Sequence, residues 1–586
     1  MAVNGERNSQ VKDKTNGHVG GQIHEVHGEV KGDSLKHTNL DRFHNKPIHS
    51  QRHLKVIVIG AGASGLCFAY KLQRSFSDFT LKLYEKNDGV SGTWLENKYP
   101  GYTYSFEPNP DWSNVYASAQ EIFQYFDAFK TKYGLQRYCS LRHEVIGATW
   151  SNQNGAWDVT VKNLATQETF SDQCDVLISA SGILNHWRMP EIPGISSFRG
   201  PIVHSAAWND QIQLSGKDVG LIGNGSSGIQ ILPALQPDVK KITTFMRSPT
   251  WISPPVGNEQ RAYTVKEKSQ FKDHPEELTK IRKEIDLKQH GLFPLFLRNT
   301  DLHETTRVDL TREMKMKINN PAIENSLIPG WGPGCRRLTP GIGYLEALTK
   351  PNVELVFGGI ESIDENGLVC AGKQYSVDAI VCATGFDTSF RPRFSINGLD
   401  NINLQEEWIE PRSYLGLAAP NMPNYFHFLG PNCPIGNGPV LIAIEAQADY
   451  MLSFCDRWQT ENIHSFVPKQ RAVEDFSAFT DKFMERTVWV EDCNSWYKGR
   501  SPSGRIAGPW PGSTLHYLET IRQPRYDDWN IEYNGNRFAW LGNGQSQAEV
   551  LPAADLGWYI RTEDDGPYLS RRRWIENLTS RRTKPQ

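Results

Sequence analysis

Apolar runs of strand length alternate with segments of helical periodicity at two places along the chain. Leu54–Ile59 and Lys217–Ile222 are such runs, and each is followed by a glycine-rich turn and an apolar helical pattern. A further apolar run follows each helix, at Thr80–Glu85 and at Lys241–Met246. Strands that alternate with helices form parallel sheets, so the pattern predicts two βαβ units and an α/β fold class.

The first glycine-rich turn has the G-x-G-x-x-G spacing of a dinucleotide-binding fingerprint. Glycines at these positions allow a tight turn, close approach of the backbone to a pyrophosphate, and close packing of the helix, whose N-terminus favours phosphate. The strand after the helix ends in an acid, about 20 residues beyond the fingerprint, where a carboxylate binds ribose hydroxyls. The predicted cofactor-binding residues are Gly60, Gly62, Ser64, Gly65 and Glu85.

The second turn repeats the fingerprint, but the strand after its helix ends in Arg247 instead of an acid. An acid would repel the 2′-phosphate of NADP, whereas a guanidinium can bind it through two hydrogen bonds. We therefore predict NADPH over NADH, the alternative being a surface arginine on a solvent-facing turn. Two dinucleotides in one chain indicate electron transfer between a flavin and a nicotinamide, and hence two Rossmann-like domains. The further residues predicted at this site are Gly223, Gly225, Ser226, Ser227 and Gly228.

Composition narrows the class of partner. A chain of 586 residues with 38% hydrophobic residues can form two or three domains. A net charge of -3 argues against nucleic acid or an anionic membrane as the main partner, so we expect small molecules. The sequence contains no apolar run of about twenty residues, so no membrane span is predicted. It gives no indication of the oligomeric state.

The cysteines indicate the compartment. Nine cysteines are scattered without a C-x-x-C pair, and their number is odd. This pattern predicts reduced thiols in a reducing, cytoplasmic compartment, with neither a disulfide framework nor a metal site.

Two stretches resemble a known family. Gly92-Thr-Trp94 and Tyr99-Pro-Gly101 are similar to the loop that lies along the flavin in flavoprotein monooxygenases of the Baeyer–Villiger type, which implies FAD contacts from Thr93, Trp94 and Tyr99. The stretch from 198 to 208 fits F-x-G-x-x-x-H-x-x-x-W, the signature of type I Baeyer–Villiger monooxygenases. The resemblance implies that this linker couples domain motion to the state of the cofactor. Its signature residues here are Phe198, Gly200, His204 and Trp208.

The resemblance also implies where the chemistry occurs. The segment 334–340 is similar to the one that presents two adjacent cations in this family, so Arg336 is expected to contact NADP and Arg337 to face the flavin as the catalytic residue. A fixed guanidinium in a water-poor site would stabilise the negatively charged oxygen adduct of the reduced flavin. The segments 493–497 and 508–512 resemble the fungal branch of the family that serves secondary metabolism, which implies that Trp496 covers NADP.

Family resemblance and local pattern together suggest a discontinuous domain organisation. We expect a disordered leader over 1–52, a first part of the FAD-binding domain over 53–190, and an NADPH-binding domain over 191–369. A helical insertion is expected at about 255–330, over the active site, and residues 370–586 should complete the FAD-binding domain and a closing segment. Asp175–Gly182 and Asp378–Gly385 resemble the two strand-turn crossings between such domains.

One feature departs from the family. The element that ends at Gly101 is normally followed by a Cys-Asp run whose aspartate lies near the flavin, and this chain lacks it. Glu107 and Asp111 belong to the downstream motif and do not fill that position. A gene-model error, a real deletion compensated by another acid, and a flavoprotein that no longer inserts oxygen are the three explanations.

The resemblance implies an enzyme that uses FAD and NADPH to insert one oxygen atom from O2 next to a ketone carbonyl, giving an ester or lactone. The substrate class that it implies is a polyketide or terpenoid ketone. The alternatives are oxygenation of a nitrogen or sulfur, and an uncoupled NADPH oxidase, which the missing run after Gly101 would favour.

Overall fold

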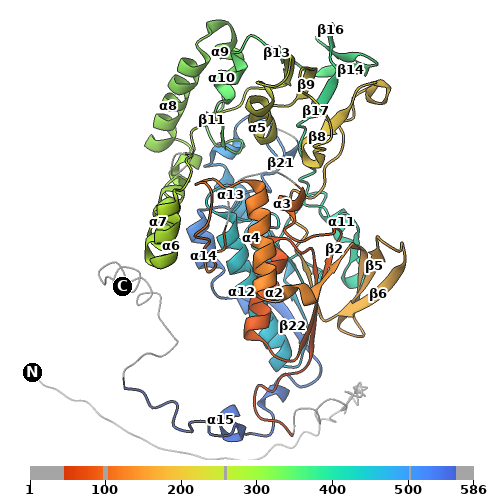
Figure 1. The fold of residues 1–586 in the computed structure, drawn as a ribbon. Helices are drawn as coiled ribbons and strands as arrows, with labels where there is room; N and C mark the ends of the chain where they lie inside the picture. The colour runs from red at the N-terminus through yellow and green to blue at the C-terminus, as the bar shows by residue number, and fades with distance from the viewer. Residues whose placement is uncertain (1–44, 97–102, 256–259, 501–502, 563–586) are drawn as a thin grey trace, which may run out of the picture.

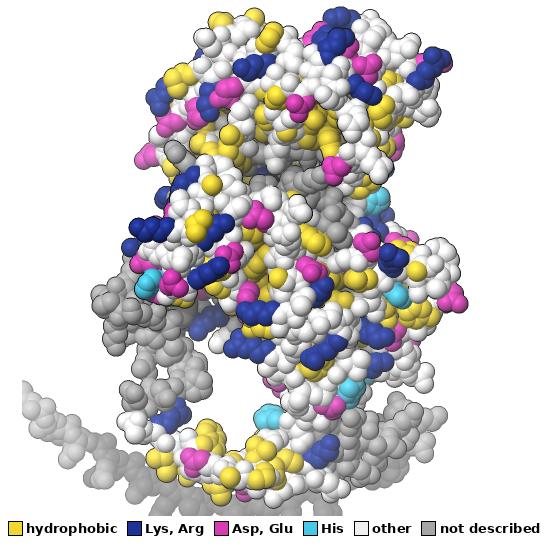
Figure 2. Space-filling view, in the orientation of Figure 1, with side chains coloured by type: hydrophobic (Ala, Val, Ile, Leu, Met, Phe, Trp, Pro, Cys, Tyr) yellow, Lys and Arg dark blue, Asp and Glu magenta, His cyan; other side chains and the backbone are white. Residues whose placement is uncertain are grey.

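The computed structural model describes residues 45–96, 103–255, 260–500 and 503–562. Tyr99, Gly101 and most of the expected leader lie outside the described residues. Two five-stranded sheets occupy separate halves of the molecule, the first in the lower half of Figure 1 and the second in the upper half. On the face shown in Figure 2, cationic and anionic side chains are interspersed.

All neighbouring strands of the first sheet are parallel, in the order β19-β7-β1-β2-β3. Apolar residues dominate β1 because both faces of the sheet are covered, and α2 packs beside α12 on one of them. The elements of this half are β1 (Leu54–Ile59), α2 (Ala63–Ser75), β2 (Phe79–Glu85), α3 (Thr93–Glu96), α4 (Ala119–Lys132), β3 (Cys139–Leu141), β7 (Val176–Ser179), β19 (Tyr425–His427) and α12 (Val440–Thr460).

The second sheet is also entirely parallel, in the order β13-β10-β9-β17-β8. The predicted strands on either side of both fingerprints are present, and the predicted fold class with two Rossmann-like domains is confirmed. The elements are β8 (Ile202–His204), β9 (Asp218–Ile222), α5 (Ser226–Leu235), β10 (Lys241–Met246), α10 (Tyr344–Leu348), β13 (Val353–Phe357) and β17 (Ala379–Cys382).

The chain crosses between the sheets at the two predicted positions. Asp175–Gly182 contains β7 of the first sheet, and the chain then enters β8 of the second. Asp378–Gly385 contains β17 of the second sheet, and the chain then returns towards β19 of the first. The second sheet therefore extends past residue 370, where the expected domain boundary was set.

Each parallel sheet is accompanied by antiparallel strands that we did not predict. In β5, buried and partly exposed residues alternate because only one face of this sheet packs on the core. The first group is the antiparallel set β4 (His143–Ser151), β5 (Ala156–Asn163) and β6 (Thr169–Cys174), with β18 (Ser395–Asn397) added parallel to β4, and the second is the antiparallel set β14 (Ile360–Asp364), β15 (Gly367–Cys370) and β16 (Lys373–Ser376).

The expected insertion is helical. A capping box begins its first helix, where Thr264 and Glu267 satisfy each other's backbone N–H groups. Arg282 of α7 donates to the carbonyl oxygens of Tyr104 and Ser105, which ties the insertion to the half that contains the first sheet. The insertion contains α6 (Val265–Asp273), α7 (Pro275–His290), α8 (Asp301–Ile318) and α9 (Pro321–Leu327).

The other elements are short or lie in the C-terminal part. None of the helices in the described residues is long and apolar enough to cross a membrane. These elements are β11 (Ile252–Ser253), β12 (Thr339–Pro340), α11 (Leu404–Glu407), β20 (Ile463–Pro468), α13 (Gln470–Met484), β21 (Tyr497–Arg500), α14 (Thr514–Thr520), β22 (Trp529–Tyr533) and α15 (Gln547–Val550).

The end of the expected leader packs on the protein. Arg52 is only 7% exposed, its guanidinium lies 3.4 Å from the ring centroid of Trp458, and it donates to the carbonyl oxygens of Trp458 and Ile463. A buried cation with these hydrogen-bond partners fixes the backbone around it, so the part of the expected leader next to Arg52 belongs to the folded protein.

The prediction that all cysteines are reduced is wrong for two of them. Cys335 and Cys493 form a disulfide, although they are 158 positions apart in sequence. Their Cα atoms are 6.3 Å apart because the fold brings their segments together, which spacing along the chain cannot reveal. The seven other cysteines are free thiols.

Candidate functional site

A cavity of about 2900 Å³ lies between the two sheets. Both glycine fingerprints, the arginine pair and the predicted covering tryptophan open onto it. The predicted site residues that line it are Gly60, Gly62, Ser64, Glu85, Thr93, Trp94, Trp208, Gly223, Gly225, Ser226, Ser227, Arg247, Arg336, Arg337 and Trp496.

The first fingerprint needs its glycines for backbone geometry. Gly60 has φ +106°, and a Cβ atom there would lie 2.7 Å from the carbonyl oxygen of Ala180. A Cβ atom on Gly65 would collide with the carbonyl oxygen of Gly60. The crossing strand and α2 therefore approach the turn too closely for any side chain.

The second fingerprint repeats this geometry almost atom for atom. Gly223 has φ +104°, a Cβ atom on it would lie 2.6 Å from Ala383 O, and one on Gly228 would collide with Gly223 O. Gly225 differs, since a Cβ atom there would meet no protein atom within 4 Å. Space beside this backbone is what a bound pyrophosphate requires.

The helices after the two turns both begin without a side-chain cap. Gly62 and Gly225 are the residues before α2 and α5, and neither offers a side-chain cap. The first turns of both helices contain no acid. Uncapped N–H groups and the positive end of the helix dipole form a binding site for an anion such as a phosphate.

Glu85 is held at the end of β2 beside the first fingerprint. It is 5% exposed, and its carboxylate accepts hydrogen bonds from Ala61 N at 2.8 Å and Asn87 N at 3.0 Å. Each carboxylate oxygen can accept a second hydrogen bond, and Glu85 lines the cavity. The carboxylate is therefore fixed in position to accept from a hydroxyl in the cavity.

Arg247 and Arg336 place two cations beside the second fingerprint. Burial, followed by the positive charge of Arg247, lowers the pKa of Arg336. Arg336 donates to Ser248 Oγ at 3.1 Å and to Pro249 O at 3.2 Å, which are both neutral. Of the ion pairs between described residues, none includes either arginine. Two neighbouring cations without a carboxylate favour an anionic ligand.

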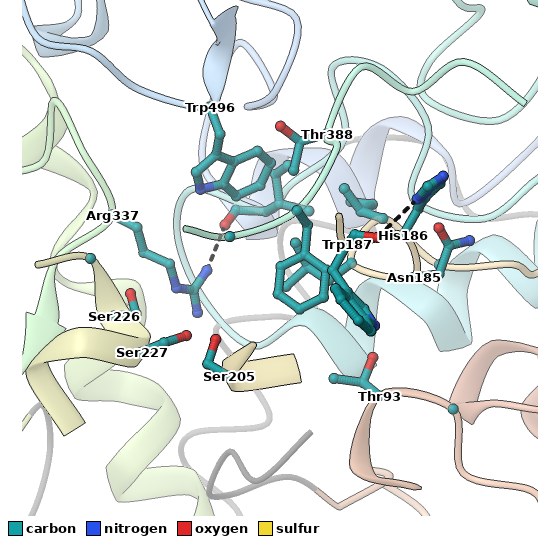
Figure 3. A pocket seen from close by; sticks show the side chains of 18 of the residues that line it. Thr93, Asn185, His186, Trp187, Ser205, Ser226, Ser227, Arg337, Thr388 and Trp496 are labelled. Atoms are coloured by element: carbon teal, nitrogen blue, oxygen red, sulfur yellow. Dashed lines mark hydrogen bonds between the residues drawn. The ribbon is translucent and has the colours of Figure 1, made fainter. Parts of the chain in front are cut away.

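Arg337 points into the same cavity, as Figure 3 shows. Its Nη1 atom donates to Ile435 O at 3.2 Å, which fixes the guanidinium at the side of the first sheet's half. Tyr497 is fully buried nearby, where burial raises the pKa of its hydroxyl and the charge of Arg337 opposes that rise. Trp496 lies over this part of the cavity, with its ring 4.6 Å from that of Tyr497.

Of the predicted linker residues, Trp208 lines the cavity, whereas Phe198, Gly200 and His204 do not. His204 is fully buried at the end of β8 and stacks on Trp187 with ring centroids 4.8 Å apart. Its ring also meets Phe386 edge-on at 6.4 Å, and Trp187 and Phe386 form a backbone bridge. Because Trp187 follows the first crossing and Phe386 the second, His204 contacts both connections between the halves.

The other linker residues pack tightly nearby. A Cβ atom on Gly200 would collide with Asp378 O at the second crossing and lie 2.7 Å from the ring of Phe198. Burial lowers the pKa of His204, so the imidazole is neutral at neutral pH, and Nδ1 accepts from Ala206 N.

Sequence reasoning missed several residues of the site. Trp187, Phe386 and Ile435 contact predicted residues, and His427 lines the cavity although nothing in its local pattern indicated it. An aromatic residue directly after the second crossing was the only available signal, and it pointed to Phe386. No group of three or more His, Cys, Asp or Glu in the described part of the chain is arranged to hold a metal ion.

Comparisons with known proteins agree with this geometry. Residues 58–129 match the model for an NAD(P)-binding Rossmann-like domain, and residues 99–279 match the model for flavin-binding monooxygenase-like proteins. The solved structure of cyclohexanone monooxygenase from Rhodococcus sp. Phi1 bound to NADP+ aligns with a TM-score of 0.71 at 25% identity, over 83% of this chain and 100% of the other.

Two relatives are similar along most of their length. The FAD-binding monooxygenase moxY of Dothistroma septosporum is 37% identical over 84% of this chain and 82% of its own. The Baeyer-Villiger monooxygenase of Streptomyces coelicolor is 32% identical over 86% of this chain and 97% of its own. The chain therefore belongs to the flavin-binding monooxygenase family that includes the Baeyer–Villiger monooxygenases.

Proposed function

We propose that this protein is an FAD- and NADPH-dependent monooxygenase that inserts one oxygen atom from O2 next to a ketone carbonyl, giving an ester or a lactone. One observation carries the proposal. The first glycine fingerprint with Glu85 and the second with Arg247 and Arg336, here called the first and second cradle, belong to different sheets and open into one cavity, in which the cation of Arg337 also lies. The two nucleotides could then exchange a hydride in the same cavity in which Arg337 stabilises negative charge.

The first cradle fits FAD. Gly60 and Gly65 allow the tight turn and the close packing of α2, Gly62 leaves the start of α2 without a side-chain cap, and Glu85 would accept hydrogen bonds from ribose. Thr93 and Trp94 line the cavity beyond this cradle and would lie along the flavin. When bound, FAD accepts a hydride from the nicotinamide and in its reduced form activates O2.

The second cradle fits NADPH. Ser226 and Ser227 line the cavity at the start of α5, whose N-terminus has no side-chain cap and would bind a phosphate. Arg247 and Arg336 provide the positive charge that a 2′-phosphate needs and that NADH would leave unsatisfied. Trp496 covers the cavity from the C-terminal segment.

Arg337 would act on the charge that develops during oxygen transfer. Its guanidinium is fixed by Ile435 O, so it needs no reorganisation at the moment of reaction. Arg337 is exposed to the cavity, so it would stabilise negative charge on oxygen by about 3–4 kcal/mol once bound cofactors and substrate exclude water.

His204 would couple the halves instead of transferring a proton. It contacts both crossings through Trp187 and Phe386, so a rotation of one half against the other has to repack this stack. Packed interfaces of this kind change between discrete arrangements. We propose that this stack links the orientation of the halves to cofactor binding.

The substrate proposal rests on the fungal-branch likeness of the C-terminal segments and is a polyketide or terpenoid ketone of secondary metabolism. The partners are then this ketone and O2, in the cytoplasm. The volume of the cavity is compatible with a bulky substrate beside two dinucleotides.

The test uses FAD-loaded protein, NADPH and 18O2 with a panel of cyclic and polyketide-like ketones. Conversion of a ketone to an ester or lactone with one 18O atom, at one product per NADPH, supports the proposal. A matched panel of thioethers and amines serves as the comparison. Oxygenation of those compounds, with every ketone unchanged, would assign the protein to heteroatom oxidation.

A second candidate is an uncoupled NADPH oxidase. The missing run after Gly101 favours it, because the family's aspartate near the flavin is absent. In that case NADPH is consumed with one hydrogen peroxide per NADPH, and no compound in either panel acquires 18O.

A further inference from the structure

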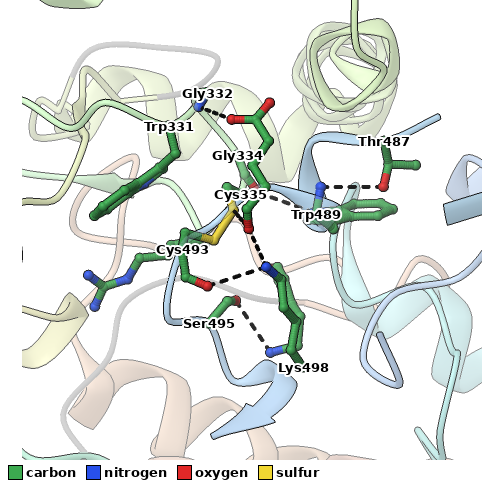
Figure 4. The surroundings of a disulfide bond; sticks show 12 residues. Trp331, Gly332, Gly334, Cys335, Thr487, Trp489, Cys493, Ser495 and Lys498 are labelled. Carbon is green, nitrogen blue, oxygen red and sulfur yellow. Dashed lines mark hydrogen bonds between the residues drawn. A yellow bond between two sulfur atoms is a disulfide. The ribbon is translucent and has the colours of Figure 1, made fainter. Parts of the chain in front are cut away.

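The disulfide joins the two segments that supply the upper wall of the cavity. Cys335 directly precedes Arg336 and Arg337, and Cys493 lies three residues before Trp496. Both cysteines are fully buried. Figure 4 shows the bond between the glycine-rich turn at 332–334 and the segment that continues to Lys498.

The segment around Cys493 forms a loop that is held by its own hydrogen bonds. Lys498 Nζ donates to the carbonyl oxygens of Glu491 and Cys493, so residues 491–498 form a compact loop. Partial burial lowers the pKa of Lys498, while the neighbouring carboxylates oppose that effect. Trp496 is carried by this loop and therefore moves with it.

Hydrogen bonds also connect the loop to the arginine segment. The Glu491 carboxylate accepts from Gly332 N at 2.6 Å, and Trp489 Nε1 donates to Gly334 O at 3.1 Å. These contacts hold the base of the loop. The disulfide holds the part nearer to Trp496 and is the one covalent link between the two segments in the described residues.

We propose that Cys335 and Cys493 form a reversible redox site that controls how firmly the Trp496 loop is held on the arginine pair. In the disulfide form the loop is fixed over the second cradle and NADP(H) is retained. In the dithiol form the loop moves more freely and NADP(H) leaves faster. The consequence for NADP(H) rests on the proposed function, whereas the cross-link does not.

The chemistry balances with hydrogen peroxide as the oxidant, which uncoupled turnover of the proposed enzyme releases. One thiolate attacks a peroxide oxygen, the O–O bond breaks, and a sulfenic acid and hydroxide form. The second thiolate attacks that sulfur, the S–S bond forms and a second hydroxide leaves. The two thiol protons convert both hydroxides to water. A small dithiol reverses the step by exchange and becomes a cyclic disulfide.

The residues next to the two cysteines in sequence lie at the cavity. Arg336, Asn494 and Ser495 line it, whereas both cysteine side chains are buried behind them, so a small oxidant or reductant in the cavity reaches the sulfurs when these neighbouring residues are displaced.

The test compares oxidised and reduced forms of the same FAD-loaded wild-type protein, which requires no substitution. Peroxide-treated protein should contain seven free thiols, and protein treated with dithiothreitol should contain nine. Calorimetry with NADP+ should give a Kd about tenfold higher for the reduced form. Limited proteolysis should cut the 491–505 region faster after reduction.

Substitutions then show whether the change in NADP+ affinity comes from Cys335 and Cys493. Cys335→Ser and Cys493→Ser should each have the high Kd of the reduced form, with or without dithiothreitol. Cys139→Ser, which changes a partly buried free thiol in β3, should keep the wild-type response. Equal Kd values for oxidised and reduced wild type, or nine thiols after peroxide treatment, would overturn the redox proposal. Binding of NADP+ to neither form would instead overturn the proposed function.

Discussion

The half-buried guanidinium of Arg336 lies close enough to Arg247 for the second cation to lower its pKa, in addition to the larger effect of burial. Both face the cavity beside the second glycine fingerprint. Two neighbouring like charges repel each other, and an anionic ligand that binds both removes this cost. This pair is the physical reason to expect selection of NADPH over NADH.

We predict that Arg247→Ala weakens NADP+ binding by about 10- to 100-fold, the effect of losing a charge-assisted contact of about 1.5–3 kcal/mol. Binding of NAD+ should hardly change, so discrimination between the two nucleotides collapses. Calorimetry with both nucleotides measures this. Arg199→Ala is the control, because Arg199 is exposed and pairs with Glu365. Equal losses for NADP+ and NAD+ would show that Arg247 does not bind the 2′-phosphate.

Alanine substitutions at Gly225 and Gly228 should have different effects, the first on NADP+ binding and the second on stability. The backbone at Gly225 is extended, with φ -77°, and a Cβ atom there meets no protein atom within 4 Å. Gly225→Ala should therefore leave the Tm unchanged but weaken NADP+ binding by about tenfold, since the methyl group occupies the space of the pyrophosphate. Gly228→Ala should lower the Tm, because its Cβ collides with Gly223 O. Unchanged NADP+ affinity in Gly225→Ala would place the pyrophosphate elsewhere.

Arg337 should affect oxygen transfer and not flavin reduction. Arg337→Ala is expected to lower the rate of product formation by about 10²- to 10³-fold, as loss of one preorganised donor does. Reduction of FAD by NADPH under anaerobic conditions should stay within about threefold of wild type, because Arg247 and Arg336 are intact. Stopped-flow reduction and product analysis give the two rates. Arg337→Lys tests geometry, since it keeps the charge but loses the fork that binds Ile435 O.

His427 predicts a dependence of stability on pH. It is 4% exposed, neither ring nitrogen has a hydrogen-bond partner within the described residues, and burial lowers its pKa to about 3. The unfolded chain binds a proton at a pKa of about 6.5, so this contribution to stability is full above pH 6.5 and decreases as pH falls towards 3. Between pH 7 and pH 5 the loss is about 2 kcal/mol.

His427→Leu should remove that loss, so the difference in unfolding free energy between variant and wild type grows by about 2 kcal/mol from pH 7 to pH 5. Urea unfolding of the FAD-free protein at both pH values measures it. His274→Gln, at an exposed histidine, should follow the wild type. A variant that loses as much stability as the wild type would show that His427 is protonated in the folded protein.

Local patterns were sufficient for the parts of the fold that bind nucleotides. Leu54–Ile59 and Lys241–Met246 are strands with the predicted bounds, because buried parallel strands are continuous apolar runs next to turns that only glycine can form. The sequence of β5 also carries a period of two in its buried residues, Trp157, Val159 and Val161, which would have predicted an antiparallel strand.

Contacts between distant segments could not be predicted. The stack of His204 on Trp187 and the bond between Cys335 and Cys493 depend on how the halves pack, and no local spacing encodes that. Arg337 lines the cavity, and its contact with the flavin stays a prediction, while its acceptor Ile435 O had no signal in the sequence. The proposed contact of Tyr99 with the flavin stays a prediction, since Tyr99 lies outside the described residues.

The proposed function requires that NADPH in the second cradle reduces FAD in the first cradle of the same chain. This electron transfer is the most direct test. FAD-loaded protein is mixed with NADPH without oxygen, and the absorbance of the oxidised flavin is followed by stopped flow, with NADH in a parallel experiment. With NADPH, the absorbance of the oxidised flavin should be lost completely. With NADH at equal concentration, the rate should be at least about tenfold lower. An oxidised flavin that persists with NADPH, or equal rates with both nucleotides, would contradict the account.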